Sequence, residues 1–244
     1  VSVPGASTGS VGISADLRFW GAEANAYRNL VYTSCWEVTA LAGFRYLDLM
    51  ENLGVSSTSA DLLLGGTTTT VPDRFTTRNQ LYLGQVGAQA TWTSGPVFVN
   101  FQGKVGLGPN GERVRILGSS IQTVPGFPTR FSQGGLLAVP ATPALPGGGN
   151  FGVHSSNFFV IVPEVGLDVG WQISERVRLS AGYSLLYINS VARPGSQVNP
   201  TINRALVPSD PVFGSASGPN QPAVSSKQET FFAHGALLNL ELCY

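Results

Sequence analysis

The C-terminal segment, residues 231–244, places apolar side chains at every second position and ends on an aromatic residue. The intervening positions carry Gly235, Asn239 and Glu241. Because side chains alternate between the two faces of a strand, one face is apolar and the other is polar. A soluble sheet over a core also fits this pattern. The aromatic terminus and the recurrence of the pattern along the chain favour a transmembrane β-barrel. Six of the seven residues in this series are apolar or aromatic, His234 being the exception: Phe232, His234, Ala236, Leu238, Leu240, Leu242 and Tyr244.

The composition agrees with membrane-spanning strands and neutral loops. Charged residues make up 11% of the chain, against about 25% in an ordinary soluble domain. No apolar run approaches the ~18 residues of a membrane-spanning helix. The net charge is +0 and the sequence has no Lys/Arg run, so no nucleic-acid partner is expected. No cofactor is expected either.

Seven segments repeat the period of two, which predicts an all-β fold: an antiparallel transmembrane β-barrel. In the first segment the apolar residues change phase, so a β-bulge is expected near Phe19 and Trp20. The segments are residues 14–28, 36–50, 78–92, 96–107, 158–171, 176–188 and 231–244.

The connections between these segments alternate in length. Short turns follow the first, third and fifth segments, and long loops of about residues 51–77, 108–157 and 189–230 follow the second, fourth and sixth. Outer-membrane barrels have short periplasmic turns and long extracellular loops. The pattern therefore predicts a single barrel domain over residues 1–244 in the bacterial outer membrane, with its long loops extracellular.

The polar faces of the segments supply the candidate functional residues. One hypothesis is that they fill the barrel interior with ion pairs and hydrogen bonds; the other is that they line a polar channel and set its ion preference. The predicted lumen-lining residues are Glu23, Glu37, Arg45, Gln85, Gln89, Asn100, Gln102, Lys104, Glu164, Asp168, Arg178, Asn239 and Glu241. At the short-turn end, Trp36, Trp92, Trp171 and Tyr244 fall in the outward phase and are predicted to form an aromatic girdle.

Other candidate chemistry is weak. Cys35 and Cys243 share the inward phase at the short-turn end, so a disulfide is an alternative to two separate thiols. Glu164 and Asp168 lie on one face of one segment, where ion pairing is favoured over catalysis by paired carboxylates. No nucleophile elbow, phosphate-binding loop or metal-ligand spacing is present, so neither a catalytic residue nor a metal site is predicted.

Several stretches carry a family resemblance: FWGAEANAYRNL (19–30), LAGFRYLDL (41–49), DRFTTRNQLYLGQVGAQ (73–89), GGLLAVP (134–140), VIVPEVGLDVGWQI (160–173) and SVARPG (190–195). In this order they resemble the bacterial outer-membrane β-barrel porin family of the porin-7 type, over about residues 11–244. The resemblance implies an outer-membrane barrel and carries no established substrate. Family members usually have further strands upstream of the first stretch, so an intact barrel of about ten strands is expected.

The sequence therefore predicts a porin-like passive channel or a structural membrane protein with a polar lumen, without enzymatic activity. The expected partners are the lipid bilayer, the barrel-assembly machinery acting on the C-terminal strand, and other copies or chains. One alternative is a structural subunit of an oligomeric or filamentous surface assembly. Another is a soluble secreted β-sandwich adhesin, whose apolar face would be buried against a second sheet.

Overall fold

The computed structural model describes residues 5–63, 65–174 and 176–242, with side chains up to residue 240. Its strands are β1 (Ser7–Tyr32), β2 (Trp36–Asp61), β3 (Thr68–Ser94), β4 (Val97–Thr123), β5 (Arg130–Gln133), β6 (Gly152–Ser174), β7 (Val177–Val191) and β8 (Glu229–Leu242). Two short helical turns, α1 (Pro194–Gln197) and η1 (Arg204–Leu206), lie between β7 and β8. No helix in the described residues is long and apolar enough to cross a membrane.

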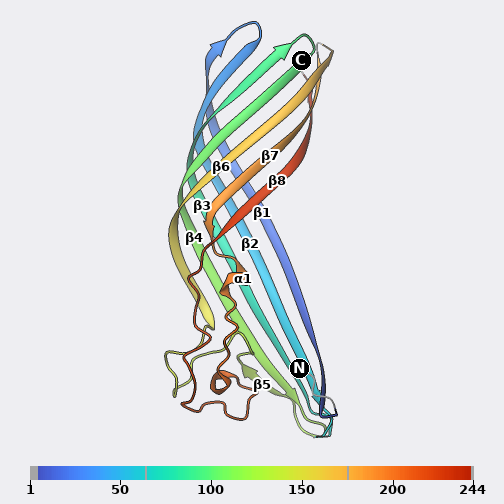
Figure 1. Ribbon diagram of the computed structural model, residues 1–244, viewed down its shortest axis with the longest axis vertical. Coiled ribbons are helices and arrows are strands. Elements are labelled where there is room, and N and C mark those ends of the chain that lie inside the picture. Colours follow the sequence, from blue (N-terminus) through green and yellow to red (C-terminus); the bar gives the residue numbers. More distant parts are fainter. Residues whose placement is uncertain (1–4, 64, 175, 243–244) are drawn as a thin grey trace.

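The strands form one antiparallel sheet that curls into a half-barrel (Figure 1). Its order is β1-β2-β3-β4-β6-β7-β8, and the short β5 pairs with β4 outside this path. Within the described residues, β1 and β8 are the two edges of the sheet. The all-β antiparallel prediction, with seven strands visible, is therefore confirmed.

The strands are longer than predicted, and the loop boundaries change accordingly. The loop expected at residues 51–77 is wrong over most of its length, because β2 continues to Asp61 and β3 begins at Thr68. Likewise β4 continues to Thr123, inside the loop expected at 108–157. The two remaining long connections, 124–151 and 192–228, gather at the end of the half-barrel opposite the short turns (Figure 1). The added parts of β2 and β3 are rich in Ser and Thr. They form strands because their backbones pair with each other, and not because apolar residues alternate along them.

The expected bulge near Phe19 and Trp20 is also wrong. The β1–β2 register runs unbroken through both residues, and its irregularity lies between Asn29 and Val31. The change of phase at Phe19 instead marks an apolar side chain on the concave face, where it contacts Phe231 of β8.

The convex face of the sheet is apolar over the half nearest the short turns. Phe44, Val86, Phe101 and Leu167 are half exposed there, with exposed fractions between 50% and 60%. No second sheet covers this face in the described residues. The β-sandwich of the adhesin alternative is therefore wrong as a fold. An uncovered apolar band of this width is the kind of surface that contacts lipid or a partner.

Candidate functional site

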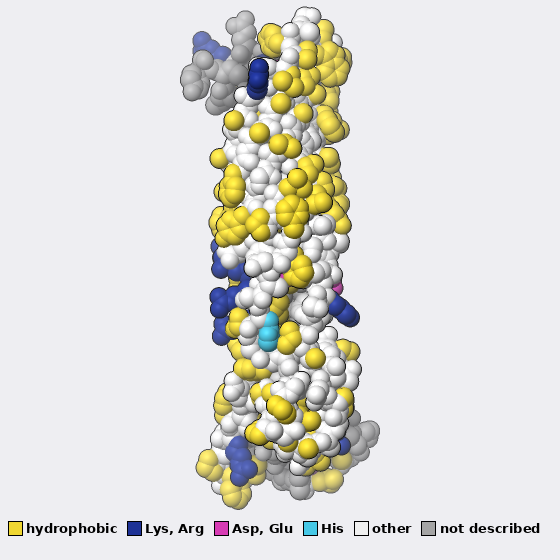
Figure 2. Space-filling view, turned by 90° about the vertical axis from the view of Figure 1, so that its left-hand side faces the viewer, with side chains coloured by type: hydrophobic (Ala, Val, Ile, Leu, Met, Phe, Trp, Pro, Cys, Tyr) yellow, Lys and Arg dark blue, Asp and Glu magenta, His cyan; other side chains and the backbone are white. Residues whose placement is uncertain are grey.

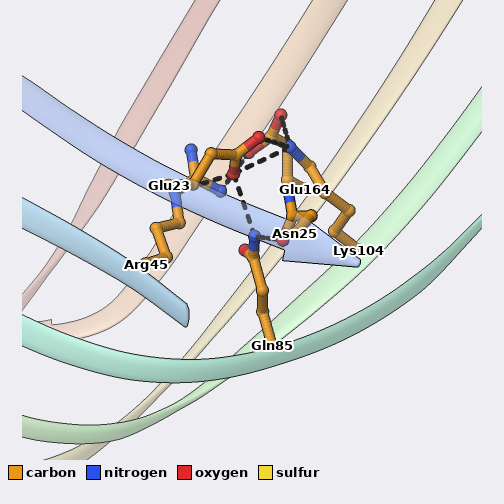
Figure 3. Close-up of polar contacts among 6 residues, drawn as sticks. All are labelled: Glu23, Asn25, Arg45, Gln85, Lys104 and Glu164. Atoms are coloured by element: carbon orange, nitrogen blue, oxygen red, sulfur yellow. Dashed lines mark hydrogen bonds and ion pairs between the residues drawn. The ribbon is translucent and has the colours of Figure 1, made fainter. Parts of the chain in front are cut away.

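An ionic cluster crosses the concave face of the half-barrel (Figure 3). Lys104 on β4 lies 3.1 Å from Glu23 Oε1 on β1 and 3.2 Å from Glu164 Oε1 on β6. Arg45 on β2 pairs with Glu164 and lies 3.8 Å from Glu23. The two carboxylates and the two basic groups give the cluster a net charge of zero. Charges that are shielded from water need such pairing to be stable. Only 6% of the Lys104 side chain is exposed.

Two amide side chains and one glycine complete the ionic cluster. Gln85 on β3 donates from Nε2 to Glu23 at 3.0 Å and to Asn25 Oδ1 at 2.6 Å. Gly87 lies opposite Lys104 in the β3–β4 register, where a Cβ would meet Lys104 Cγ at 2.9 Å. The missing side chain at Gly87 thus leaves room for the lysine to reach across the half-barrel.

An apolar layer lies next to the ionic cluster, on the side of the long loops. In β2 and β3, the side chains of this layer point to the concave face, as those of the ionic cluster do. They come from positions two and four residues closer to the long loops. The rings of Phe19 and Phe231, from the two edge strands, approach to 5.2 Å between centroids. The layer comprises Leu47, Leu49, Leu81, Leu83, Val160, Val162, Leu186, Ile188, Val191 and Phe231. The prediction of a polar interior is therefore wrong at this level.

On the other side of the ionic cluster, a cavity of about 570 Å³ opens at the short-turn end. Six predicted lumen-lining residues line it: Glu37, Gln89, Asn100, Asp168, Arg178 and Asn239. Gln102, half-buried on β4, pairs in register with Gln89. The Glu241 side chain lies outside the described side chains. The predicted residues thus divide between a filled cluster and an open cavity.

Three of the four predicted girdle residues and one of the two predicted disulfide cysteines lie in the described part of the chain. Trp36 and Trp92 are directly opposite each other in the β2–β3 register, and Trp171 lies near the same end. Their exposed fractions are 50%, 37% and 55%. Cys35 is exposed in the turn between β1 and β2. Tyr244 and Cys243 lie outside the described residues, so the full girdle and the disulfide stay predictions.

The structure does not bring together a catalytic or metal centre in its described part. Glu164 is occupied by Arg45 and Lys104, whereas Asp168 faces the cavity and accepts a hydrogen bond from Asn100. No group of three or more His, Cys, Asp or Glu residues suited to a metal ion occurs among the described residues.

Sequence reasoning missed the residues that hold the long connections on the concave face. Asp73 on β3 is buried and accepts hydrogen bonds from the backbone N–H groups of Leu136, Leu137 and Ala138 at 3.1, 3.0 and 3.0 Å. Burial raises the pKa of Asp73, while the three donors act in the opposite direction. A Cβ on Gly135 would lie 1.9 Å from Asp73 Oδ1, so glycine permits this approach.

The connection after β7 is held in a similar way. Arg193 donates from Nη2 and Nε to the carboxylate of Glu51 on β2, at 2.7 and 3.2 Å to Oε1. This hydrogen bonding raises the pKa of Arg193. Asp73, Gly135 and Arg193 all belong to stretches quoted above for the family resemblance, which was the one available signal for them.

The comparisons with known proteins agree with this fold. A family model described as "Putative beta barrel porin-7 (BBP7)" matches residues 1–244, the whole chain. The chain therefore belongs to this family of β-barrel porins, and the predicted resemblance is confirmed. A search of curated proteins and a search of solved structures each found no significant match.

Proposed function

We propose that this chain acts in the bacterial outer membrane as a structural barrel wall whose interior is closed, rather than as an open pore. The family name suggests that membrane. The observation that carries the proposal is the apolar layer beside the ionic cluster, with Phe19 and Phe231 in contact across the concave face. An apolar constriction excludes water, and an ion crossing it loses its hydration.

The convex face supports the placement of the bilayer. Along β2, the apolar series runs from Trp36 to Tyr46, and along β3 it runs from Trp92 to Tyr82. Ten residues of tilted strand correspond to roughly 25 Å, the height of the apolar band of outer-membrane barrels. Because β2 continues to Asp61, the remaining half of the strand would extend beyond the bilayer with the long connections. We place this half on the extracellular side.

The partners we propose follow from the same surface. The lipid bilayer contacts the apolar convex face. The barrel-assembly machinery acts on β8, whose Leu238 and Leu240 are 76% and 64% exposed. An intact barrel of about ten strands would cover the edges of β1 and β8, because unpaired backbone groups are not stable in lipid.

A planar-bilayer recording tests the closed interior. The wild-type protein is expected to insert without discrete conductance steps. Leu81→Ser/Leu83→Ser replaces part of the apolar layer with hydroxyls and is expected to produce steps. Gly84→Ser is the matched control on the same strand, since Gly84 is on the convex face and a Cβ there would meet only the Leu107 carbonyl oxygen, at an ordinary contact distance of 3.9 Å.

Insertion is verified separately by flotation of proteoliposomes and by heat-modifiable gel mobility. Stable steps from the wild-type protein would overturn the closed interior and favour the second candidate function, a passive channel. The cavity of about 570 Å³ favours that candidate, because it forms a wide polar mouth beside the ionic cluster. In a conducting channel, Lys104→Glu is expected to shift the permeability ratio toward cations, and an unchanged ratio would exclude Lys104 from the ion path.

A further inference from the structure

Five arginines gather on the convex face, although no Lys/Arg run exists in the sequence. In the strand register, Arg18 of β1, Met50 of β2, Arg78 of β3 and Arg113 of β4 are successive partners in one row. Arg115 lies two residues further along β4. We call Arg18, Arg74, Arg78, Arg113 and Arg115 the arginine patch. Figure 2 shows Lys and Arg side chains at mid-height of the molecule, below a half with few charged groups.

The arginine patch holds more positive charge than its neighbours neutralise. Arg78 pairs with Asp48, with 2.6 Å between Nη2 and Oδ2. Arg18, Arg74, Arg113 and Arg115 are exposed, and none of them forms a hydrogen bond or a close ion pair with a described residue. The acids on this face are Asp48, which also attracts Arg18 at longer range, and Asp16, so five arginines face two carboxylates. Arg78 and Arg113 lie directly opposite each other, and like charges in such cross-strand pairs are destabilising. A bound anion would relieve this repulsion.

The position of the arginine patch indicates which anion. On the convex face it directly follows an aromatic row, in which the rings of Trp20 and Tyr46 are 5.3 Å apart and those of Tyr46 and Tyr82 are 5.1 Å apart. Aromatic rows of this kind lie at the level of lipid headgroups. The arginine patch would then lie at the phosphates of the outer leaflet. This step rests on the proposed function, specifically on the placement of the bilayer.

We propose that the arginine patch binds the phosphate groups of anionic lipid headgroups in the outer leaflet. The guanidinium group suits this role, because its planar donors match two phosphate oxygens at once and it stays charged at any physiological pH. Neighbouring arginines on β3 and β4 offer donors to one headgroup that carries more than one phosphate.

Native mass spectrometry of the intact protein in zwitterionic micelles, with diphosphorylated lipid A added, tests the assignment. Wild type is expected to retain the lipid, and Arg113→Gln/Arg115→Gln is expected to bind it more weakly by on the order of tenfold. The matched control is Arg130→Gln, an exposed arginine on β5 outside the arginine patch. Equal binding by wild type and the double variant would overturn the proposal.

Two further measurements separate the sources of phosphate and the two proposals. Inorganic phosphate at millimolar concentration is expected to compete poorly; displacement of the lipid at that concentration would mean that the arginine patch binds a free anion. Proteoliposome flotation is measured on the same samples. Failure to insert would reject the proposed function, whereas insertion with no preference for the phosphorylated lipid would reject only the arginine-patch assignment.

Discussion

The side chain of Asn79 exchanges two hydrogen bonds with the backbone of Ala192. The Ala192 N–H donates to Asn79 Oδ1 at 2.8 Å, and Asn79 Nδ2 donates to the Ala192 carbonyl at 2.9 Å. The amide thus supplies to the connection after β7 the donor and the acceptor that a neighbouring strand would supply. β3 and β7 are not neighbours in the sheet, so Asn79 joins two walls of the half-barrel through its interior.

Asn79→Ala is expected to lower the free energy of unfolding by about 3 kcal/mol, because it leaves two buried backbone groups unpaired. Urea unfolding of the protein in detergent micelles measures this effect. Asn52→Ala is the control, since Asn52 is only half-buried and bonds side chains alone, Asp16 and Thr76. Equal losses in the two variants would mean that the Asn79 contact contributes nothing beyond an ordinary side-chain bond.

Lys104→Gln is expected to destabilise the protein by about 3 kcal/mol, because Glu23 and Glu164 then lack their shared cation in a shielded site. Adding Glu23→Gln restores the charge balance and leaves Arg45 to pair with Glu164. The double variant is therefore expected to be more stable than Lys104→Gln alone. The double-mutant cycle is measured by the same urea titration, and simple additivity of the two changes would contradict the coupling.

Glu112→Gln is expected to change the pH dependence of stability. Burial raises the pKa of Glu112 despite hydrogen bonds from Gln228 and Ser156. A folded-state pKa above the unfolded value means that the folded protein holds the proton more tightly, so stability falls as pH rises from the unfolded pKa through the folded one. Relative to wild type, the Gln variant should gain stability over that pH window in thermal melts.

Asp210 provides the control of opposite sign. The hydrogen bond from Arg204 lowers the pKa of Asp210, so its contribution is present above the unfolded pKa and is lost as pH falls through the folded one. Asp210→Asn should therefore lose stability relative to wild type as pH rises through the same acidic range. Slopes of the same sign in the two variants would show that neither carboxyl causes them.

Gly135→Ala is expected to release the connection between β4 and β6 from the concave face. Its Cβ would overlap the Asp73 carboxylate and break up to three hydrogen bonds, a loss of about 3 kcal/mol. Limited proteolysis should then cut residues 124–151 faster than in wild type. Gly12→Ala, with open space around its Cβ position, should leave the cleavage rate unchanged.

The period of two was enough to predict the sheet and the phase of its polar residues. The charged residues of the ionic cluster and Gln85 were predicted because they lie on strands in which polar and apolar faces alternate clearly. Gln85, for example, lies between Gly84 and Val86, whose positions belong to the other face. Their division into a cluster and a cavity was not predictable. It depends on how tightly the sheet curls, and local sequence does not encode that curvature.

The apolar layer was overlooked because the strands were predicted from an alternation of apolar and polar residues, and the residues of this layer interrupt that alternation. Leu47 and Leu49 on β2, like Leu81 and Leu83 on β3, are apolar in the inward phase. Two apolar phases in one strand indicate burial on both faces, so the signal was present in the sequence. The Asp73 contacts had no comparable local signal, because the three N–H groups come from residues 63 to 65 positions away.

The length of β1 to β4 has a consequence for how the protein meets its surroundings. About half of each strand lies past the aromatic row, and the strand pairing continues to Asp61 at the end of β2 and from Thr68 at the start of β3. Proteases need an extended, unpaired backbone. We therefore expect proteases to cleave β1 to β4 only at their connecting turns, so these four paired strands would hold the long connections on a cleavage-resistant support.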